Sequence, residues 1–144
     1  MLYSLVIVVG LIGGIAVGLQ SPIAGLMGQK IGGVASSFVV HLGGLIFSGL
    51  LLIIYRGQNI NSWHALPWYM LGVGAFGVIL FLSVTFTLPR LGAAMMITLI
   101  VVGQLGVGIV IDHFGLFGTS IHQFSIVRLA GVVALLLGSY LISV

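Results

Sequence analysis

The sequence predicts an all-α membrane protein with five transmembrane helices. Only 3% of its 144 residues are charged, whereas a soluble domain has roughly 25%. Hydrophobic residues make up 60% of the chain, and its mean hydropathy is +1.39. The apolar runs are continuous, whereas the strands of a membrane barrel alternate in polarity. A soluble enzyme, a nucleic-acid-binding protein and a disordered tail are therefore excluded.

The first predicted helix runs from about Leu2 to Leu19, because a bilayer-spanning helix needs about 20 mostly apolar residues. It is expected to end at Gln20-Ser21-Pro22. It has no basic start and no small-residue cleavage site, so we interpret it as a retained transmembrane helix and not a signal peptide. Residues 23–33 could extend either neighbouring helix or lie in the membrane interface.

The second and third helices are separated by a polar loop from Arg56 to His64. The second is predicted over about residues 34–55. The third is predicted over about residues 67–88, because Pro67 suits the first turn of a helix. Pro89-Arg90 is expected to form a tight break before the next helix.

The fourth helix is predicted over about residues 92–111, and Asp112-His113-Phe114-Gly115 closes it. The fifth is predicted over about residues 126–142. The chain has the length of one small domain, so residues 1–144 are interpreted as a single five-helix transmembrane domain.

Basic residues are balanced between the two sides of the membrane. With five helices the termini lie on opposite sides, which places Arg56 and Arg128 on one side and Lys30 and Arg90 on the other. An excess of Lys and Arg normally sets orientation, so a chain without that excess can insert both ways. Two alternatives stay open: the few charges balance by chance, or a partner fixes the orientation.

Small and polar residues form stripes along four of the predicted helices, at helical spacing. The stripes comprise Gly13, Ala16 and Gln20; Ser37, His41, Gly44 and Ser48; Gly72, Phe76, Ser83 and Thr87; and Gln104, Gly108 and Asp112. Such faces are unfavourable toward lipid, so they point at protein or water. Helix packing is one interpretation of these stripes, and lining of a substrate cavity is the other.

His41 and Gln104 favour the cavity interpretation, because both are large polar groups near the middle of their helices. Asp112 is the one acidic residue of the chain and lies at a helix end, where ion coupling and a structural role are both open. His41 is expected to act as a neutral hydrogen-bonding group and not as a proton carrier. The candidate substrate-binding residues are Gln20, Ser37, His41, Ser83, Thr87 and Gln104.

Catalytic and cofactor-dependent chemistry finds no support in the sequence. The chain has no cysteine, one acidic residue and no phosphate-binding loop of the Walker type. The loop histidines His64, His113 and His122 show no regular spacing of metal ligands. We therefore expect no enzyme activity, no cofactor and no metal.

Several segments resemble the YdcZ family, a branch of the drug/metabolite transporter superfamily. These segments are Gly18-Leu19-Gln20-Ser21-Pro22, Pro67-Trp68-Tyr69, Leu91-Gly92-Ala93-Ala94, Gly103-Gln104, Ile111-Asp112-His113-Phe114-Gly115 and Arg128-Leu129-Ala130-Gly131. The resemblance implies a multi-pass protein of the bacterial inner membrane. It also implies a five-helix unit equivalent to half of a ten-helix transporter built from inverted repeats.

An antiparallel homodimer would rebuild the ten-helix shape from two copies of the chain, and the balanced basic residues agree with it. The resemblance thus implies a transporter, such as an exporter of a metabolite or drug, that works by alternating access. The expected partners are membrane lipid, a small-molecule substrate and a second copy of the chain. A membrane structural or regulatory subunit, or a small channel, is the alternative.

Overall fold

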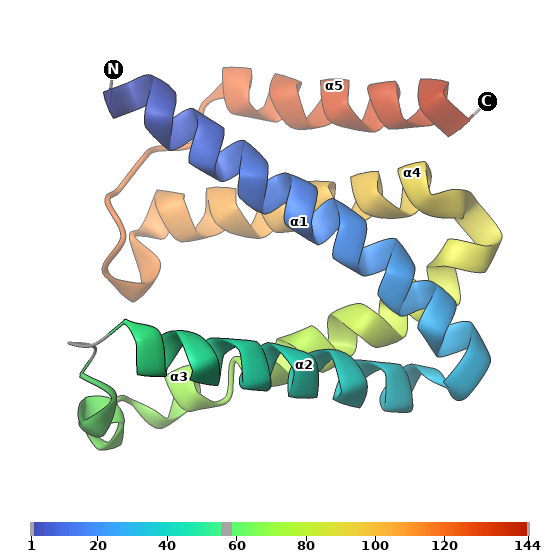
Figure 1. The fold of residues 1–144 in the computed structure, drawn as a ribbon. Coiled ribbons are helices and arrows are strands. Elements are labelled where there is room, and N and C mark those ends of the chain that lie inside the picture. The colour runs from blue at the N-terminus through green and yellow to red at the C-terminus, as the bar shows by residue number, and fades with distance from the viewer. Residues whose placement is uncertain (1, 56–58, 144) are drawn as a thin grey trace. The chain divides into compact units, whose positions relative to one another are not determined.

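The computed structural model describes residues 2–55 and 59–143, and every regular element in that part of the chain is helical (Figure 1). The prediction of an all-α protein is confirmed. The chain divides into two compact units, with the boundary between Leu88 and Pro89.

The first unit begins with α1 (Leu2–Ile31), which is longer than predicted. The helix continues through Pro22 instead of ending there, so the segment 23–31 extends the first helix, one of the options that the sequence leaves open. A proline removes one backbone hydrogen bond, but membrane helices tolerate it where neighbouring helices pack around the site. Here Ala24, Gly25 and Gly28, which follow the proline, are buried.

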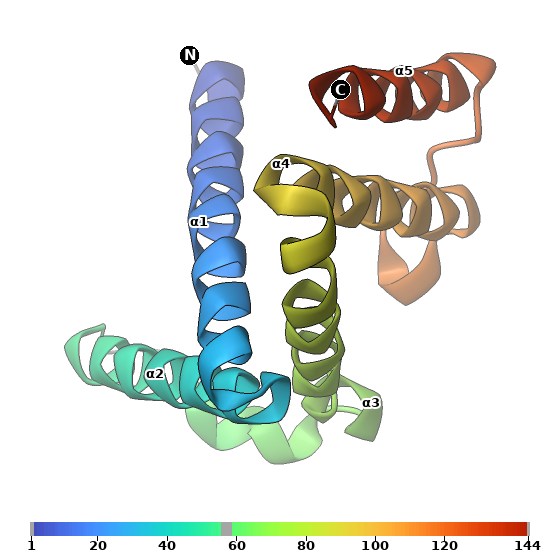
Figure 2. The ribbon, with the colours of Figure 1, turned by 90° about the vertical axis from the view of Figure 1, so that its right-hand side faces the viewer.

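A tight turn at Gly32 joins α1 to α2 (Gly33–Ile54), as Figures 1 and 2 show. Gly32 has a φ of 89°, a conformation that glycine adopts at little cost. The buried Ser36 Oγ then donates a hydrogen bond of 2.7 Å to the carbonyl oxygen of Ala24. This bond satisfies the hydroxyl and ties the start of α2 to α1.

The predicted third helix is interrupted near its start. After a 3-10 helix, η1 (Ile60–Ala65), the short α3 (Trp68–Leu71) is separated from α4 (Gly74–Phe114) by Gly72 and Val73. Figure 1 shows α3 as a single short coil before α4 begins.

The expected break at Pro89-Arg90 lies two residues further on. Both residues belong to α4, and the non-helical backbone is at Gly92, with φ 74° and ψ 171°. A positive φ is unfavourable for residues with a side chain, so the bend falls at the glycine and not at the proline. The bend also divides a 47-residue apolar span, Trp68–Phe114. A straight helix of that length would measure about 70 Å at roughly 1.5 Å per residue, more than twice a hydrocarbon core of about 30 Å.

Two further helices, α1 and α2, are long and apolar enough to cross a membrane, and Ile126–Gly138 is a shorter apolar segment. The described helices thus comprise three long apolar spans and this shorter segment, and five separate crossings stay a prediction.

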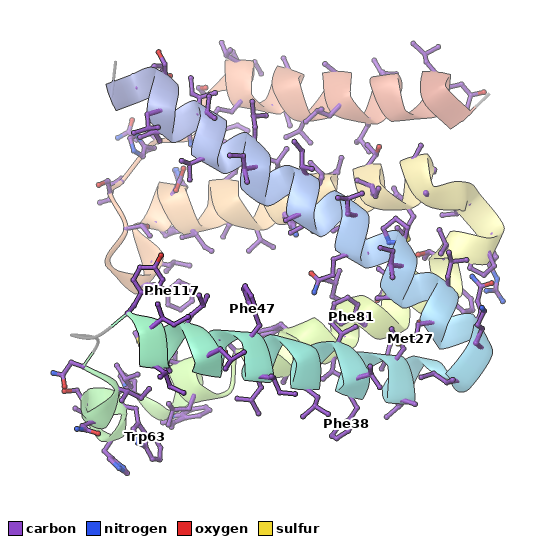
Figure 3. The ribbon with its side chains drawn as sticks, in the orientation of Figure 1. Met27, Phe38, Phe47, Trp63, Phe81 and Phe117 are labelled. Carbon is purple, nitrogen blue, oxygen red and sulfur yellow. The ribbon has the colours of Figure 1, made fainter. Side chains whose placement is uncertain are left out.

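Close helix packing in the first unit depends on glycine. A Cβ at Gly25 would lie 2.7 Å from Leu88 and 2.9 Å from Val84, and a Cβ at Gly28 would meet the side chain of Thr85. Phe81 and Val84 are buried in the same region, whereas Phe38 on α2 points away from it (Figure 3). Without a hydrophobic driving force between helices in lipid, such close approach supplies much of the attraction.

The second unit contains the part of α4 from Pro89 onward, a 3-10 helix η2 (Leu116–Gly118) and α5 (Ile126–Ser143). The observed α5 matches the predicted range of 126–142 to within one residue. Figures 1 and 2 show α5 running back along this part of α4 in the opposite direction.

Replacing Gly28 with alanine is expected to destabilise the first unit by about 1–3 kcal/mol, because extra atoms in a packed site force neighbours to shift. Thr85 cannot simply rotate away, since its Cγ2 and Cβ also lie within 3.0 Å of the added carbon. Thermal unfolding of purified protein in detergent measures the effect. Gly14→Ala is the matched control, because nothing lies within 4 Å of a Cβ there. Equal stability of the two variants would show that this contact does not hold the unit together.

Candidate functional site

His41 on α2 has a defined hydrogen-bonding state. Its Nδ1 lies 2.7 Å from the carbonyl oxygen of Ser37 and 3.3 Å from the Ser37 hydroxyl. A carbonyl oxygen can only accept, so Nδ1 carries the hydrogen and donates it. In the neutral ring, Nε2 is then the unprotonated nitrogen and can accept a hydrogen bond.

The His41 ring faces the first part of α4. It meets Phe81 edge to face, with ring centroids 5.7 Å apart and planes at 85°. Its Nε2 lies only 2.5 Å from where a Cβ on Gly77 would be, so a larger residue at 77 would displace the ring. His41 as a whole remains exposed. Its ring is thus oriented by protein contacts, while part of its surface stays available.

The other candidates in the first unit are less closely organised. The hydroxyls of Ser83 and Thr87 donate to carbonyl oxygens of their own helix, at 2.9 Å to Ile79 and 2.8 Å to Ser83. Such bonds satisfy a hydroxyl within a membrane helix. Gln20 is exposed on α1. Direct hydrogen bonds therefore join two pairs of candidates in this unit, His41 with Ser37 and Thr87 with Ser83, each within one helix.

In the second unit, the predicted polar stripe of α4 lines a groove against α5. Gln104, Gly108 and Asp112 all border this cavity of about 400 Å³. Arg128, Gly131 and Leu135 border it from α5. The four-residue spacing read from the sequence thus corresponds to a real face of the helix.

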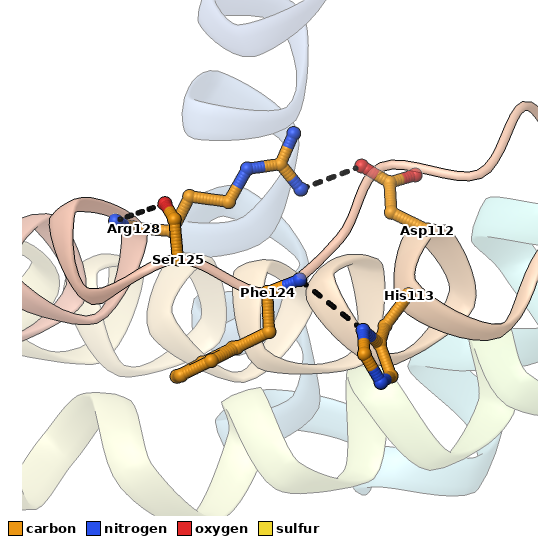
Figure 4. A network of polar contacts seen from close by, with 5 residues as sticks. All are labelled: Asp112, His113, Phe124, Ser125 and Arg128. Carbon is orange, nitrogen blue, oxygen red and sulfur yellow. Dashed lines mark hydrogen bonds and ion pairs between the residues drawn. The ribbon is translucent and has the colours of Figure 1, made fainter.

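Asp112 and Arg128 form an ion pair at one end of the groove (Figure 4). One guanidinium nitrogen donates to one carboxylate oxygen at 3.2 Å. The Arg128 and Asp112 side chains are 36% and 38% exposed. This contact supports a structural role for Asp112, whereas ion coupling stays a prediction.

The loop between α4 and α5 is tied by hydrogen bonds close to this pair. The backbone N–H of His122 donates to the Asp112 carbonyl at 2.8 Å. The N–H of Phe124 donates to His113 Nδ1 at 3.1 Å, and the N–H of Arg128 donates to the Ser125 hydroxyl at 3.3 Å (Figure 4). These bonds fix where α5 begins, and therefore where Arg128 stands relative to Asp112.

The contact between Arg128 and Asp112 is not among the predictions from the sequence. The signal was present, because the one acidic residue ends a helix and an arginine lies in the first turn of the next. Ser36 was also missed, since serines inside membrane helices are common. Among the described residues, no group of three His, Cys, Asp or Glu side chains could hold a metal ion.

Comparison with known families gives a match over almost the whole chain. The model of the family described as "Putative inner membrane exporter, YdcZ" matches residues 5–141. The resemblance read from the sequence motifs is thereby confirmed. No curated protein and no solved structure matches the chain.

The ion pair generates a prediction about stability. Asp112→Asn and Arg128→Gln should each lower the free energy of unfolding of the second unit. The double variant should lose less of this free energy than the sum of the two single losses. The coupling should be about 0.2–1 kcal/mol, the range for partly exposed pairs, as measured by thermal unfolding in detergent. Additive losses would mean that the two side chains do not interact in the folded protein.

Proposed function

The chain belongs to the family described as "Putative inner membrane exporter, YdcZ", and on that premise we propose that it exports a small metabolite or drug as an antiparallel homodimer. The protein is a multi-pass protein of the inner membrane, and its family is one of transporters and not of enzymes. The observation that carries the proposal is the extent of the match, which leaves out only residues 1–4 and 142–144. A motif shared by chance would cover far less of the chain.

The balance of basic residues supports the antiparallel arrangement. Lys30, Arg90 and Arg128 lie in the described part of the chain, whereas Arg56 lies outside it. Two copies in opposite orientations would be related like the inverted repeats of larger transporters, with the substrate held between them. Alternating access then follows from rocking of one copy against the other around the bound substrate.

Within such a dimer, the substrate-binding residues are Gln20, Ser37, His41, Ser83, Thr87 and Gln104. His41 serves as a neutral hydrogen-bonding group, in which Nδ1 donates to the Ser37 carbonyl and Nε2 is the nitrogen that accepts. Asp112 provides either ion coupling or structural support through Arg128.

A transport screen in proteoliposomes, run with and without a pH gradient, tests the proposed function. Saturable uptake of a small molecule at rates limited by conformational change supports a transporter. Flux at channel-like rates contradicts alternating access, and the absence of both uptake and ligand-dependent thermal stabilisation favours a structural or regulatory subunit.

Dual insertion gives a prediction of its own. A tag at the C-terminus should be accessible from both sides of the membrane in comparable fractions, because neither side carries an excess of Lys and Arg. Two lysines added beside Arg56 should shift the N-terminus to the cytoplasm. If more than about nine tenths of unmodified chains share one orientation, the chain does not insert both ways.

His41→Gln is expected to retain much of the transport, because glutamine also offers a hydrogen-bond acceptor. Initial uptake rates in proteoliposomes measure the effect. Asp112→Asn, assayed in parallel, shows whether uptake is coupled to the pH gradient. Full loss of pH-driven uptake in His41→Gln, with substrate binding intact, would make His41 a proton carrier and contradict its assignment here.

A further inference from the structure

The groove between α4 and α5 has charged residues at one end, an apolar middle and a polar side chain further along. The Asp112–Arg128 ion pair lies at one end, and Gln104 lies two helical turns away. At about 1.5 Å per residue, the eight positions between Asp112 and Gln104 correspond to roughly 12 Å along α4. The wall between them is made of glycine and aliphatic side chains.

Gln104 has an unused side-chain amide. It forms no hydrogen bond with any described residue, although it borders the groove. It lies near the middle of the helical segment that follows Gly92. A polar side chain at that depth is costly unless it finds a partner. Ligand or water in the groove can supply that partner.

The ion pair also has unused capacity. It consists of one contact, between one nitrogen of Arg128 and one oxygen of Asp112. An arginine side chain has five N–H donors and a carboxylate has two acceptor oxygens. The remaining donors and the second oxygen have no partner among the described residues. Both groups can therefore bind a ligand.

The charge of the groove restricts which ligand fits. Asp112 and Arg128 are the ionised groups among the residues that line it, and they neutralise each other. A purely cationic ligand that bound Asp112 would displace Arg128 from it. A purely anionic ligand that bound Arg128 would displace Asp112. Either would leave one charge without its partner and would lose the attraction between these two partly exposed side chains. A ligand that carries both charges lets each residue keep an opposite charge.

We propose that this groove binds a small zwitterionic molecule with an apolar body, an inference that rests on the proposed function as an exporter. Its anion contacts Arg128 and its cation contacts Asp112. Its apolar body lies over Gly108 and Gly131, and a polar group at the far end reaches Gln104. The cavity of about 400 Å³ falls within the roughly 300–1,000 Å³ of small-molecule sites. An amino-acid-like solute and a phosphatidylethanolamine headgroup share this chemistry.

Two further cavities in the described part of the chain lack this combination. A cavity of about 490 Å³ also lies between α4 and α5, but His113 is its one titratable lining residue and the rest of its lining is apolar. A third, of about 350 Å³, is lined by Ser48, Tyr55 and two leucines of α2.

Binding to purified protein in detergent tests the proposal with a matched series of probes. L-phenylalanine carries both charges, whereas 2-phenylethylamine and 3-phenylpropanoate each carry one on a similar body. Titration calorimetry should show L-phenylalanine binding at least tenfold more tightly than either analogue. L-tyrosine should bind more tightly still, and Gln104→Leu should abolish its advantage. Equal affinity for a singly charged analogue would overturn the proposal.

A steric variant separates loss of the groove from loss of the fold. Gly131→Leu should reduce affinity for L-phenylalanine at least tenfold, because a Cβ at Gly131 meets no atom within 4 Å and the side chain would occupy the groove. Gly103→Leu, at an equally open glycine that does not line the groove, should bind like the unmodified protein. Unchanged affinity in Gly131→Leu would place the ligand elsewhere.

Dihexanoyl phosphatidylethanolamine identifies the source of the zwitterion. If it binds and the amino acids do not, with the same loss in Gly131→Leu, the zwitterion comes from lipid. Binding by none of these zwitterions overturns the proposal. The calorimetric assay measures binding and not transport. If the groove binds a zwitterion but the protein transports nothing, the exporter function is contradicted and the binding site is not.

Discussion

The absence of water from the hydrocarbon core is the constraint on which this structure depends. A polar group there must find a partner within the protein, because lipid offers none. Ser36 bonds to the Ala24 carbonyl, Thr85 to the Phe81 carbonyl and His41 to the Ser37 carbonyl. Against this background the amide of Gln104 is informative, since it is exposed and has no hydrogen-bond partner among the described residues, which indicates a place where a ligand or water can bind.

The same constraint explains why glycines lie at the helix contacts of the first unit. Lipid is as apolar as leucine, so helices gain little by burying apolar side chains against each other. They gain by close contact, which Gly25, Gly28 and Gly77 permit toward Leu88, Thr85 and His41. Gly25 and Gly28 thus bring α1 against α4, whereas Gly77 brings α4 against His41 of α2, so α4 takes part in both close contacts.

Much of this architecture could be predicted from the sequence, because periodicity and hydropathy report directly on membrane helices. The ranges of α2 and α5 and the polar face of α4 match the predictions. Proline was a poorer guide: helices pass through Pro22 and Pro89, and the break occurs at Gly92. The contact of Asp112 with Arg128 depends on the path of a loop, which periodicity does not describe.

Accessibility of single cysteines to a water-soluble thiol reagent tests most directly whether the polar faces line an aqueous substrate path. The chain has no cysteine of its own, so each introduced one reports without background. Gln104→Cys and Ser83→Cys should react with the reagent in membrane vesicles, and added substrate should slow the reaction of both cysteines. Phe38→Cys, on an exposed apolar face of α2, should stay unreactive. Equal reactivity at Phe38 and Gln104, or none at Gln104, would contradict the account.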